Sequence, residues 1–162
     1  MTQLDSILEQ VVATHGITKA MVAYGRAADR GRTDLYVAQF VEDGVLEIIG
    51  ETFDAGRYEG RHAIFERIEQ SKRDLADGYG STLLRHYLTN IDVDLDTPTV
   101  ARAGCYWMAV TDGGPDHWGR YRDVMVRGDD GAWRFRHRQV IHEGYRPGSW
   151  IETANERLRN AS

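Results

Sequence analysis

Apolar residues recur at helical spacing through the first part of the chain. Repeats of three and four residues predict an amphipathic helix that Gly16 ends, followed by a second helix that begins at Ile17. A third, short helix is predicted after a cap at Thr33 or Asp34. The apolar positions of the three helices are, in order, Leu4, Ile7, Leu8, Val11 and Val12; Ile17, Met21, Tyr24 and Ala28; and Leu35, Val37, Ala38, Phe40 and Val41.

Beyond residue 43 the apolar residues fall into short runs separated by turn-forming residues. The run "GVLEIIG" at 44–50 predicts a strand between two glycines. Residues 60–78 return to helical spacing and predict a longer helix. Its apolar stripe consists of Ile64, Phe65, Ile68 and Leu75. Four further strands are predicted at about 82–95, 98–112, 117–128 and 131–143, separated by "DTP", "DGGPD" and "GDDG".

This order of elements predicts an α+β fold, because the helices come first and antiparallel strands with tight turns come later. We expect a curved, mostly antiparallel sheet that forms a cone-shaped half-barrel, with the N-terminal helices against one face. Such a shape encloses a pocket that suits a small molecule. The sequence has no internal repeat and no linker, so residues 1–162 are expected to form a single domain. Its core is expected at about 5–145, followed by a C-terminal tail at 146–162.

The composition of the 162-residue chain is that of a soluble globular protein, with 41% apolar and 28% charged residues. No apolar run approaches the ~18 residues that cross a bilayer. The N-terminus lacks the basic and apolar segments of a secretory signal, so we expect a cytoplasmic protein without a membrane partner. The net charge of −5 disfavours nucleic acid as a partner. The basic "WRFRHR" at 133–138 is interpreted as a solvated strand face.

Sequence motifs for metals and cofactors are missing. The six histidines form no HxH or HExxH arrangement, and no cysteine–histidine set of a zinc site occurs. Asp92, Asp94 and Asp96 alternate along one predicted strand and indicate a solvated face. GxGxxG, GxxxxGKS/T and GxSxG are absent, and the single cysteine, Cys105, lies in an apolar strand as an inert thiol. We therefore expect acid–base chemistry with no metal and no cofactor.

His86 is the first candidate for that chemistry. It lies in the strand-like run "LLRHYLTNIDVDLD" at 83–96. Its face of the strand is predicted to hold Leu84, Leu88 and Asn90, and the other face Tyr87, Thr89 and Ile91. An imidazole, with a reference pKa of ~6.5, suits a general acid or base at neutral pH. A neutral core histidine with both nitrogens hydrogen-bonded is the alternative, and the residues alone leave both open.

Asp29 is the candidate carboxylate that would orient His86. A helix C-terminus is unfavourable for an anion, so an aspartate at this helix end needs a reason. Pairing with Arg26, Arg30 or Arg32 would supply another reason, and the sequence leaves both interpretations level. Tyr24 lies about 140° from Asp29 on an ideal helix. Both can face one cavity only if the helix unwinds near Asp29.

Residues 118–140 predict a hairpin in which Tyr121, Asp123 and Met125 share one face. Arg138 joins the face of the core residues Trp133 and Phe135 only if a bulge changes the register. An arginine in an apolar cavity would bind a carboxylate, a phenolate or the oxygen of a leaving group. Otherwise Arg138 is a surface residue.

The order and spacing of several segments resemble the SnoaL-like branch of the nuclear-transport-factor-2-like superfamily over about residues 5–145. The segments are "YGRAADRGRTDLYVAQFVEDGVLEI", "YEGRHAI", "LRHYLTNIDVDLD", "GRYRDVMVR" and "GAWRFRHR". The resemblance implies a cone-shaped α+β barrel. The superfamily includes scytalone dehydratase, bile-acid 7α-dehydratase, hexachlorocyclohexane dehydrochlorinase, ketosteroid isomerase, polyketide cyclases, limonene epoxide hydrolase and the largely structural β subunits of ring-hydroxylating dioxygenases.

The resemblance implies roles for four residues. In the dehydratases and the dehydrochlorinase, a strand histidine is the base and a helical aspartate orients it, which corresponds to His86 and Asp29. Tyr24 and Arg138 resemble a tyrosine and a late-strand arginine of these enzymes. The second histidine of scytalone dehydratase has no clear counterpart, because its nearest position is Val110 or a neighbour and His117 is expected in or after a turn. The residue sets of ketosteroid isomerase and the epoxide hydrolase are not evident.

The expected function is a cofactor-independent lyase, a dehydratase or related elimination enzyme, acting on a small hydrophobic cyclic or aromatic compound. His86, held by Asp29, would remove a proton next to a leaving group that Tyr24 or Arg138 assists. An isomerase or polyketide cyclase is one alternative, and a non-catalytic ligand-binding or dioxygenase β-subunit-like assembly protein is another. A homodimer or homotrimer is expected through exposed sheet surface. The expected pocket wall consists of Phe40, Ile48, Phe53, Leu84, Tyr106, Met108 and Tyr121.

Overall fold

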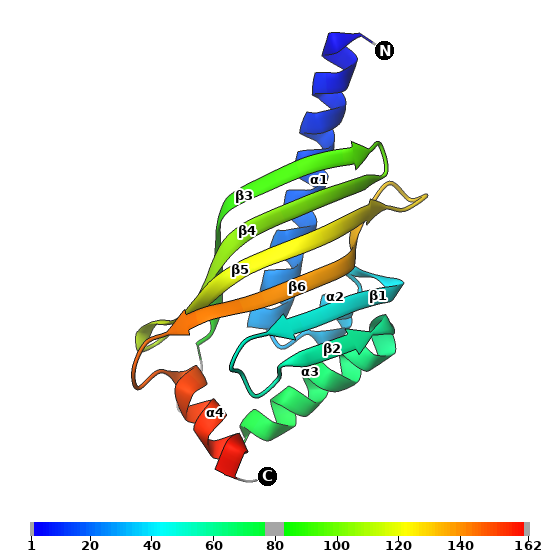
Figure 1. Ribbon diagram of the computed structural model, residues 1–162. Helices are drawn as coiled ribbons and strands as arrows, with labels where there is room; N and C mark the ends of the chain where they lie inside the picture. The colour runs from blue at the N-terminus through cyan, green and yellow to red at the C-terminus, as the bar shows by residue number, and fades with distance from the viewer. Residues whose placement is uncertain (1, 77–82, 161–162) are drawn as a thin grey trace.

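The computed structural model describes residues 2–76 and 83–160, which form helices around a curved sheet (Figure 1). The helices are α1 (Gln3–Asp29), α2 (Thr33–Val37), α3 (Gly60–Ala76) and α4 (Trp150–Asn160). The strands are β1 (Phe40–Ile49), β2 (Gly56–Glu59), β3 (Arg85–Thr97), β4 (Val100–Thr111), β5 (Gly114–Arg127) and β6 (Trp133–Tyr145).

The six strands form a single sheet in the order β2-β1-β6-β5-β4-β3. Every pairing is antiparallel except that of β1 with β6. Helix α1 crosses one face of this sheet, and α3 runs along its β1–β2 end (Figure 1). The predicted α+β fold with a curved, mostly antiparallel sheet and N-terminal helices is therefore confirmed.

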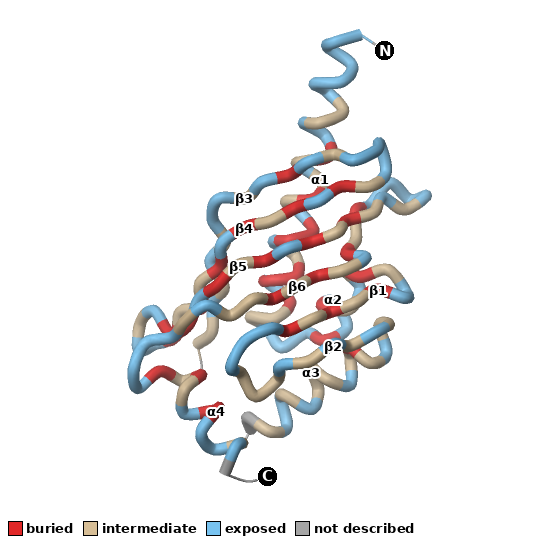
Figure 2. Tube along the Cα trace, viewed as in Figure 1, coloured by how far each residue is buried: buried red, intermediate tan, exposed pale blue. Residues whose placement is uncertain are grey.

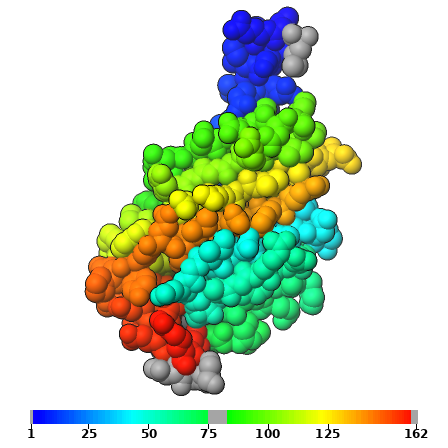
Figure 3. All heavy atoms as spheres, viewed as in Figure 1, coloured from blue at the N-terminus to red at the C-terminus, as the bar shows by residue number. Residues whose placement is uncertain are grey.

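The hydrophobic core lies between the inner sheet face and the second half of α1 (Figure 2). Ile17 and Met21 of α1 and Phe40 and Phe135 of the sheet have no exposed surface. The first turns of α1 project beyond the sheet and are exposed, as the space-filling view also shows (Figure 3). One helix therefore supplies both a core element and a protruding end.

The prediction that Gly16 ends a first helix is wrong, because α1 continues through it without a break. A Cβ on Gly16 would lie 2.7 Å from Cδ1 of Trp133. Glycine costs a helix interior about 1 kcal/mol relative to alanine, but here it lets the helix pass close over an indole ring. The real end follows Asp29, where Gly31 adopts a φ of 62°.

One further boundary differs from the prediction, and two elements, β2 and α4, were not predicted. The short helix α2 ends at Val37, and Phe40 and the residue after it begin β1 instead of continuing the helix. The four-residue β2 is too short to leave an alternating pattern. The predicted C-terminal tail contains α4, whose apolar positions are few. Residues 77–78 of the predicted helix and residue 82 of the predicted strand lie outside the described residues.

Two irregularities in the strands decide which side chains face inward. In β3 the register shifts around Asn90, which has a φ of 55°. Ile91 therefore packs against the core, contrary to the alternation predicted from the sequence. In β6 the register shifts between Phe135 and His137. This is the bulge on which an inward Arg138 depended, and Arg138 shares the inner face rather than the surface.

Candidate active site

His86 and Asp29 meet where the start of β3 passes the end of α1. The Nδ1–H of His86 donates to Oδ1 of Asp29 at 2.7 Å, and the backbone N–H of His86 donates to the same oxygen at 3.0 Å. The two side chains are 14% and 11% exposed. This contact gives the aspartate its reason for lying at a helix end. Arg32, one of its candidate partners, pairs with Asp34 instead.

A cavity of about 220 Å³ lies in front of His86. It is enclosed by the inner sheet face, the ends of α1 and α2, part of α3 and the first turn of α4. Of the predicted wall residues, Ile48, Phe53, Leu84 and Tyr121 line it. Because Nδ1 of His86 is bound by Asp29, Nε2 is the ring nitrogen left for a ligand.

Tyr24 also lines this cavity, whereas Asp29 stands behind His86. Helix α1 therefore does not unwind, and the 140° between the two residues creates no conflict. The Tyr24 and Tyr36 hydroxyls are hydrogen-bonded to each other. Burial raises the pKa of Tyr24, although nearby Arg138 lowers it in part. Tyr24 is thus a neutral phenol on the cavity wall.

Arg138 does not reach the cavity, since it is not among the described residues that line it. Its side chain is fully buried and donates to both oxygens of Asp123, at 2.9 and 2.8 Å. The guanidinium carbon lies 4.2 Å from the ring centroid of Tyr24 and 3.9 Å from that of Tyr121. Arg138 therefore packs behind the rings of Tyr24 and Tyr121, which line the cavity. It is not placed to assist a leaving group directly.

Three predicted wall residues also lie elsewhere. Phe40 is fully buried in the core. Tyr106 is 54% exposed, and Met108 shares its outward face of β4. The sequence "GCYWMAV" is apolar at nearly every position, so alternation alone did not identify the inward set. That set contains Trp107, which lines the cavity.

The structure adds a second histidine–aspartate pair that the sequence reading missed. His117 lines the cavity, and its Nδ1–H donates to Oδ1 of the fully buried Asp116 at 2.7 Å. The backbone N–H groups of Trp150 and Ile151 also donate to this carboxylate, at 2.6 and 3.2 Å. Burial would raise the pKa of Asp116, but these hydrogen bonds hold it below its usual value. The carboxylate is therefore ionised.

The adjacent aspartate and histidine in "PDHW" were the available signal for this pair. The glycines and proline before them indicated a turn, whereas β5 already begins at Gly114. In the sheet, His86 pairs with Ala109 of β4, and Ala109 pairs with His117 of β5. Neighbouring strands are ~4.8 Å apart, so the two histidines lie roughly 10 Å apart at one level of the inner face.

A third histidine, His142, also lines the cavity. Its ring stacks on His117 at 5.7 Å with an interplanar angle of 7°. Burial and the nearby charges of His117 and His86 lower the pKa of His142 to about 3. His142 is therefore a neutral imidazole at physiological pH.

Trp107 contacts all three of these imidazoles. Its ring centroid lies 6.3 Å from that of His86, 5.4 Å from that of His117 and 5.0 Å from that of His142. The side chain is 3% exposed, and its Nε1–H has no hydrogen-bond partner within residues 2–76 and 83–160. A buried donor without an acceptor is costly, so this N–H is an unsatisfied group in the wall of the cavity.

Helix α4 closes the far side of the cavity. Trp150 and Ile151 of its first turn line the space. Asn155 accepts from the backbone N–H of Phe53 at 2.8 Å and donates to the carbonyl of Glu51 at 2.9 Å. It thereby fixes the loop before β2, which also carries Asp54.

Asp54 lines the cavity from that loop. Burial raises the pKa of its carboxyl group, while a hydrogen bond from the Thr52 hydroxyl at 2.8 Å and the nearby Arg67 and His117 partly offset the effect. The sequence reading did not single out Asp54, because an aspartate in a loop is common.

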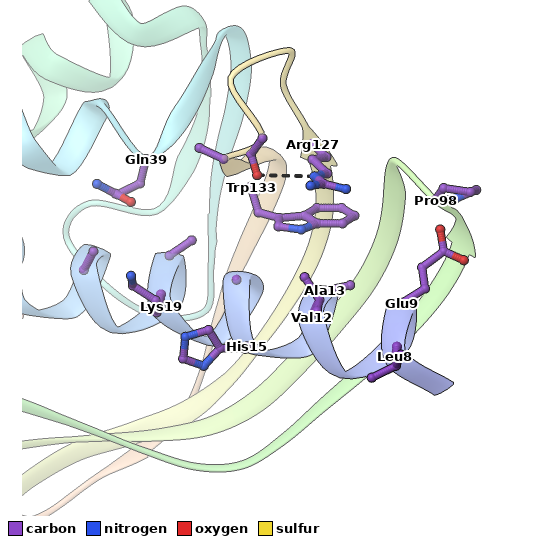
Figure 4. Close-up of a pocket in the computed structure, with 15 residues that line it drawn as sticks. Leu8, Glu9, Val12, Ala13, His15, Lys19, Gln39, Pro98, Arg127 and Trp133 are labelled. Atoms are coloured by element: carbon purple, nitrogen blue, oxygen red, sulfur yellow. Dashed lines mark hydrogen bonds between the residues drawn. The ribbon is translucent and has the colours of Figure 1, made fainter. Parts of the chain in front are cut away.

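A larger hollow of about 630 Å³ lies elsewhere, between the first half of α1 and the β5–β6 turn (Figure 4). His15, Lys19 and Trp133 line it, and Arg127 donates to the carbonyl of Gly131 at its rim. None of the histidine–aspartate pairs described above borders this hollow. The smaller cavity is therefore the better candidate for chemistry.

Three general properties of the described residues supplement this picture. No group of three or more histidine, cysteine or acidic residues in the described part of the chain is placed to hold a metal ion. Among the same residues, no helix is both long and apolar enough to cross a membrane. Burial raises the pKa of the single cysteine, Cys105, to about 12, so its thiol stays protonated.

Comparisons with known proteins agree with this architecture. The sequence matches the SnoaL-like domain over residues 9–139. A comparison with curated proteins gave no match. Among solved structures, the chain resembles a protein provisionally described as a scytalone dehydratase from Novosphingobium aromaticivorans, at 21% identity and a TM-score of 0.71, with 85% of this chain and 89% of that one covered.

Two other solved structures are similar. A nuclear-transport-factor-2-like protein with a cystatin-like fold from Novosphingobium aromaticivorans has 25% identity and a TM-score of 0.71, with 95% of this chain and 96% of that one covered. LinA has 16% identity and a TM-score of 0.71, with 86% of this chain and 92% of that one covered. These similarities support the fold, and the chemistry has to be argued from the residues of the site.

Proposed function

The chain belongs to the SnoaL-like domain family, and on that premise we propose that it is a cofactor-independent lyase. The observation that carries the proposal is the hydrogen bond from Nδ1 of His86 to Asp29, with His86 on a cavity wall. A carboxylate on Nδ1 fixes the tautomer in which Nε2 accepts a proton, and it stabilises the imidazolium that forms. His86 is thus suited to act as a general base.

The cavity supports a small, largely apolar cyclic substrate. Its volume of about 220 Å³ lies below the ~300–1,000 Å³ of drug-sized sites. Aromatic and aliphatic side chains such as Phe53, Leu84 and Tyr121 supply most of the wall. A proton next to a carbonyl group is acidic enough for an imidazole to remove, so a cyclic ketone with a leaving group at the β carbon is the substrate class we propose.

The test is a panel of small cyclic β-hydroxy and β-chloro ketones, with formation of the conjugated enone followed by ultraviolet absorption. His86→Gln and Asp29→Asn should each reduce kcat/KM by at least about 100-fold, the usual contribution of general base catalysis. The matched control is His137→Gln, since His137 pairs with Glu47 outside the cavity. Full activity of either site variant, or no activity of the wild type with any panel member, would refute the proposal.

An isomerase or cyclase is the second candidate, because the same His86–Asp29 pair can move a proton without loss of a leaving group. Product analysis separates the two: a lyase releases water or chloride, whereas an isomerase leaves the mass of the substrate unchanged. A non-catalytic assembly protein would bind panel compounds without converting them.

We also propose that the protein forms a homodimer through α1. Five apolar side chains at its protruding end are each more than half exposed, namely Leu4, Ile7, Leu8, Val11 and Val12. The hollow of Figure 4 lies beside them. An antiparallel crossing of two α1 helices centred near Val12 would bring Asp5 of one copy opposite Lys19 of the other. Opposite charges and two apolar stripes would then meet across the two-fold axis.

A further inference from the structure

We propose that His117, held by Asp116, is a second proton-transfer centre that acts as the general acid, and that the leaving group of the substrate is therefore a hydroxyl. The inference rests on the proposed function, in which His86 is the base. It adds a catalytic residue and narrows the substrate class to cyclic β-hydroxy ketones.

The first support is the position of the two imidazoles. His86 and His117 face the same cavity from β3 and β5, and only the β4 residue Ala109 separates them in the register. The alanine side chain is short, so a ring compound can lie over it with one imidazole at each end. A separation of roughly 10 Å between the backbones, from two strand spacings, leaves room for adjacent carbons of one substrate to meet both rings.

The second support is the hydrogen bonding around Asp116. This carboxylate is fully buried and accepts from His117 and from two backbone N–H groups at the start of α4. Such a partner fixes the orientation of the His117 ring, with Nδ1 toward the carboxylate and Nε2 away from it. Nδ1 of His117 is committed to Asp116, so a proton that the ring gives to a ligand must come from Nε2 of its imidazolium form.

The third support comes from the other charged and titratable groups that face His117. His142 of β6 stacks on its ring and stays neutral, so it adds no positive charge. Asp54 faces it from the loop before β2, and His86 lies across the cavity on β3. The charge nearest to His117 is thus the Asp116 carboxylate, to which its Nδ1–H is hydrogen-bonded.

Trp107 supplies the remaining element. Its buried Nε1–H lacks a partner among the described residues, and its ring touches both His86 and His117. A ring compound that meets both imidazoles would therefore pack against this indole.

The reaction balances with these groups alone. Nε2 of His86 takes the proton on the carbon next to the carbonyl, and the C–H electron pair becomes the new carbon–carbon double bond. The C–O bond at the β carbon breaks, and its electron pair leaves with the hydroxyl oxygen. That oxygen takes the proton from Nε2 of His117 and departs as water. Exchange with solvent then deprotonates His86 and reprotonates His117.

The leaving group distinguishes this arrangement from one with a base only. Hydroxide is the conjugate base of water, a very weak acid, so it leaves readily only when protonated. Chloride leaves without a proton. A site that needed only to expel chloride would gain nothing from a second carboxylate-backed imidazole at the opposite end of the cavity.

The experiment compares 3-hydroxycyclohexanone with 3-chlorocyclohexanone, which have similar size and give the same enone. His117→Asn keeps an N–H that can reach Asp116 but cannot transfer a proton. It should lower kcat/KM for the hydroxy ketone at least about 100-fold and change that for the chloro ketone less than about 3-fold. The wild-type profile of kcat/KM against pH for the hydroxy ketone should be bell-shaped, and His117→Asn should lose the fall at high pH.

His137→Asn is the matched control, and circular dichroism with thermal unfolding checks that each variant is folded. If His117→Asn does not fold, His117→Gln is measured in its place. Equal losses on the two ketones, or no loss on either, would overturn the role of His117. The underlying proposal is tested separately by His86→Gln, which should abolish elimination from both ketones. If His86→Gln is inactive while His117→Asn retains full activity, only the further inference fails.

Discussion

The geometry of the buried ion pair between Asp123 and Arg138 predicts how much stability the protein loses when one partner is removed. Both side chains have no exposed surface, and the guanidinium donates to both carboxylate oxygens, at 2.9 and 2.8 Å. Burial alone would lower the pKa of Arg138, but the adjacent Asp123 more than offsets this effect. Asp123→Leu removes the negative charge and leaves the Arg138 guanidinium buried, where no water can take the place of the lost carboxylate.

The expected cost follows from what stays behind. Removing one partner of a buried pair costs about 3–5 kcal/mol. The rings of Tyr24, Tyr121 and Phe135 remain within 4.2 Å of the guanidinium, and a desolvated cation–π contact contributes about 2 kcal/mol. We therefore expect the lower end, about 3 kcal/mol.

A double variant separates charge from packing. Asp123→Leu combined with Arg138→Met removes both charges and keeps similar volumes, so its stability should lie within about 1 kcal/mol of the wild type or above it. Urea unfolding followed by tryptophan fluorescence measures each free energy of unfolding. Asp96→Asn, at the exposed pair with Arg102, is the control and should have little effect.

Two results would refute this reasoning. A loss below about 1 kcal/mol for Asp123→Leu would mean that the guanidinium is not held away from water. A double variant as unstable as the single variant would mean that side-chain shape, rather than charge, determines the cost. If Arg138→Met restores the stability of Asp123→Leu, the cost of the single variant comes from the unpaired buried charge.

Gly16→Ala should lower stability by about 1–3 kcal/mol, because its Cβ would lie 2.7 Å from Trp133. Gly25→Ala in the same helix meets nothing closer than 3.7 Å and should be neutral or stabilising in thermal unfolding. The pKa of Asp116 in the folded protein lies below the ordinary value of 3.8, so its contribution to stability is present above that pH and is lost as pH falls through the folded pKa. Asp116→Asn should remove this part of the acid sensitivity of urea unfolding. Leu8→Glu should convert a dimer into a monomer in light scattering, and a monomeric wild type would contradict the α1 interface.

The fold was predictable because most elements carry a long repeating pattern. The helix at 60–76 and the four late strands, each at least 12 residues long, were found with boundaries within a few residues. The misplaced elements lack such a pattern. Strand β2 has four residues, and Gly16 carries the sequence signature of a helix end although its role is to admit Trp133.

Strand faces were less predictable than strands, because a bulge reverses the alternation without leaving an obvious mark. The shift at Asn90 turned Ile91 inward, and the shift before Arg138 buried that arginine. On β4, apolar residues on both faces hid the difference between Trp107 and Tyr106. Sequence alternation therefore identifies a face only where polar residues mark the other side.

The two histidines of the site also differed in how well the sequence predicted them. His86 was found because it interrupts an apolar strand and because an aspartate ends the preceding helix. His117 was missed because its pattern is that of a turn, and the sheet register that aligns it with His86 through Ala109 is a long-range property. No local pattern contains that alignment.

The two carboxylates that orient the imidazoles are each positioned by the end of a helix. Asp29 is placed by the end of α1, whereas Asp116 is placed partly by the backbone N–H groups that begin α4. Each imidazole is thus oriented by a carboxylate that a different helix end positions. In the proposed reaction the base depends on the N-terminal helix and the acid on the C-terminal one. A change that loosens α4 should therefore weaken proton donation to a hydroxyl leaving group more than proton removal by His86.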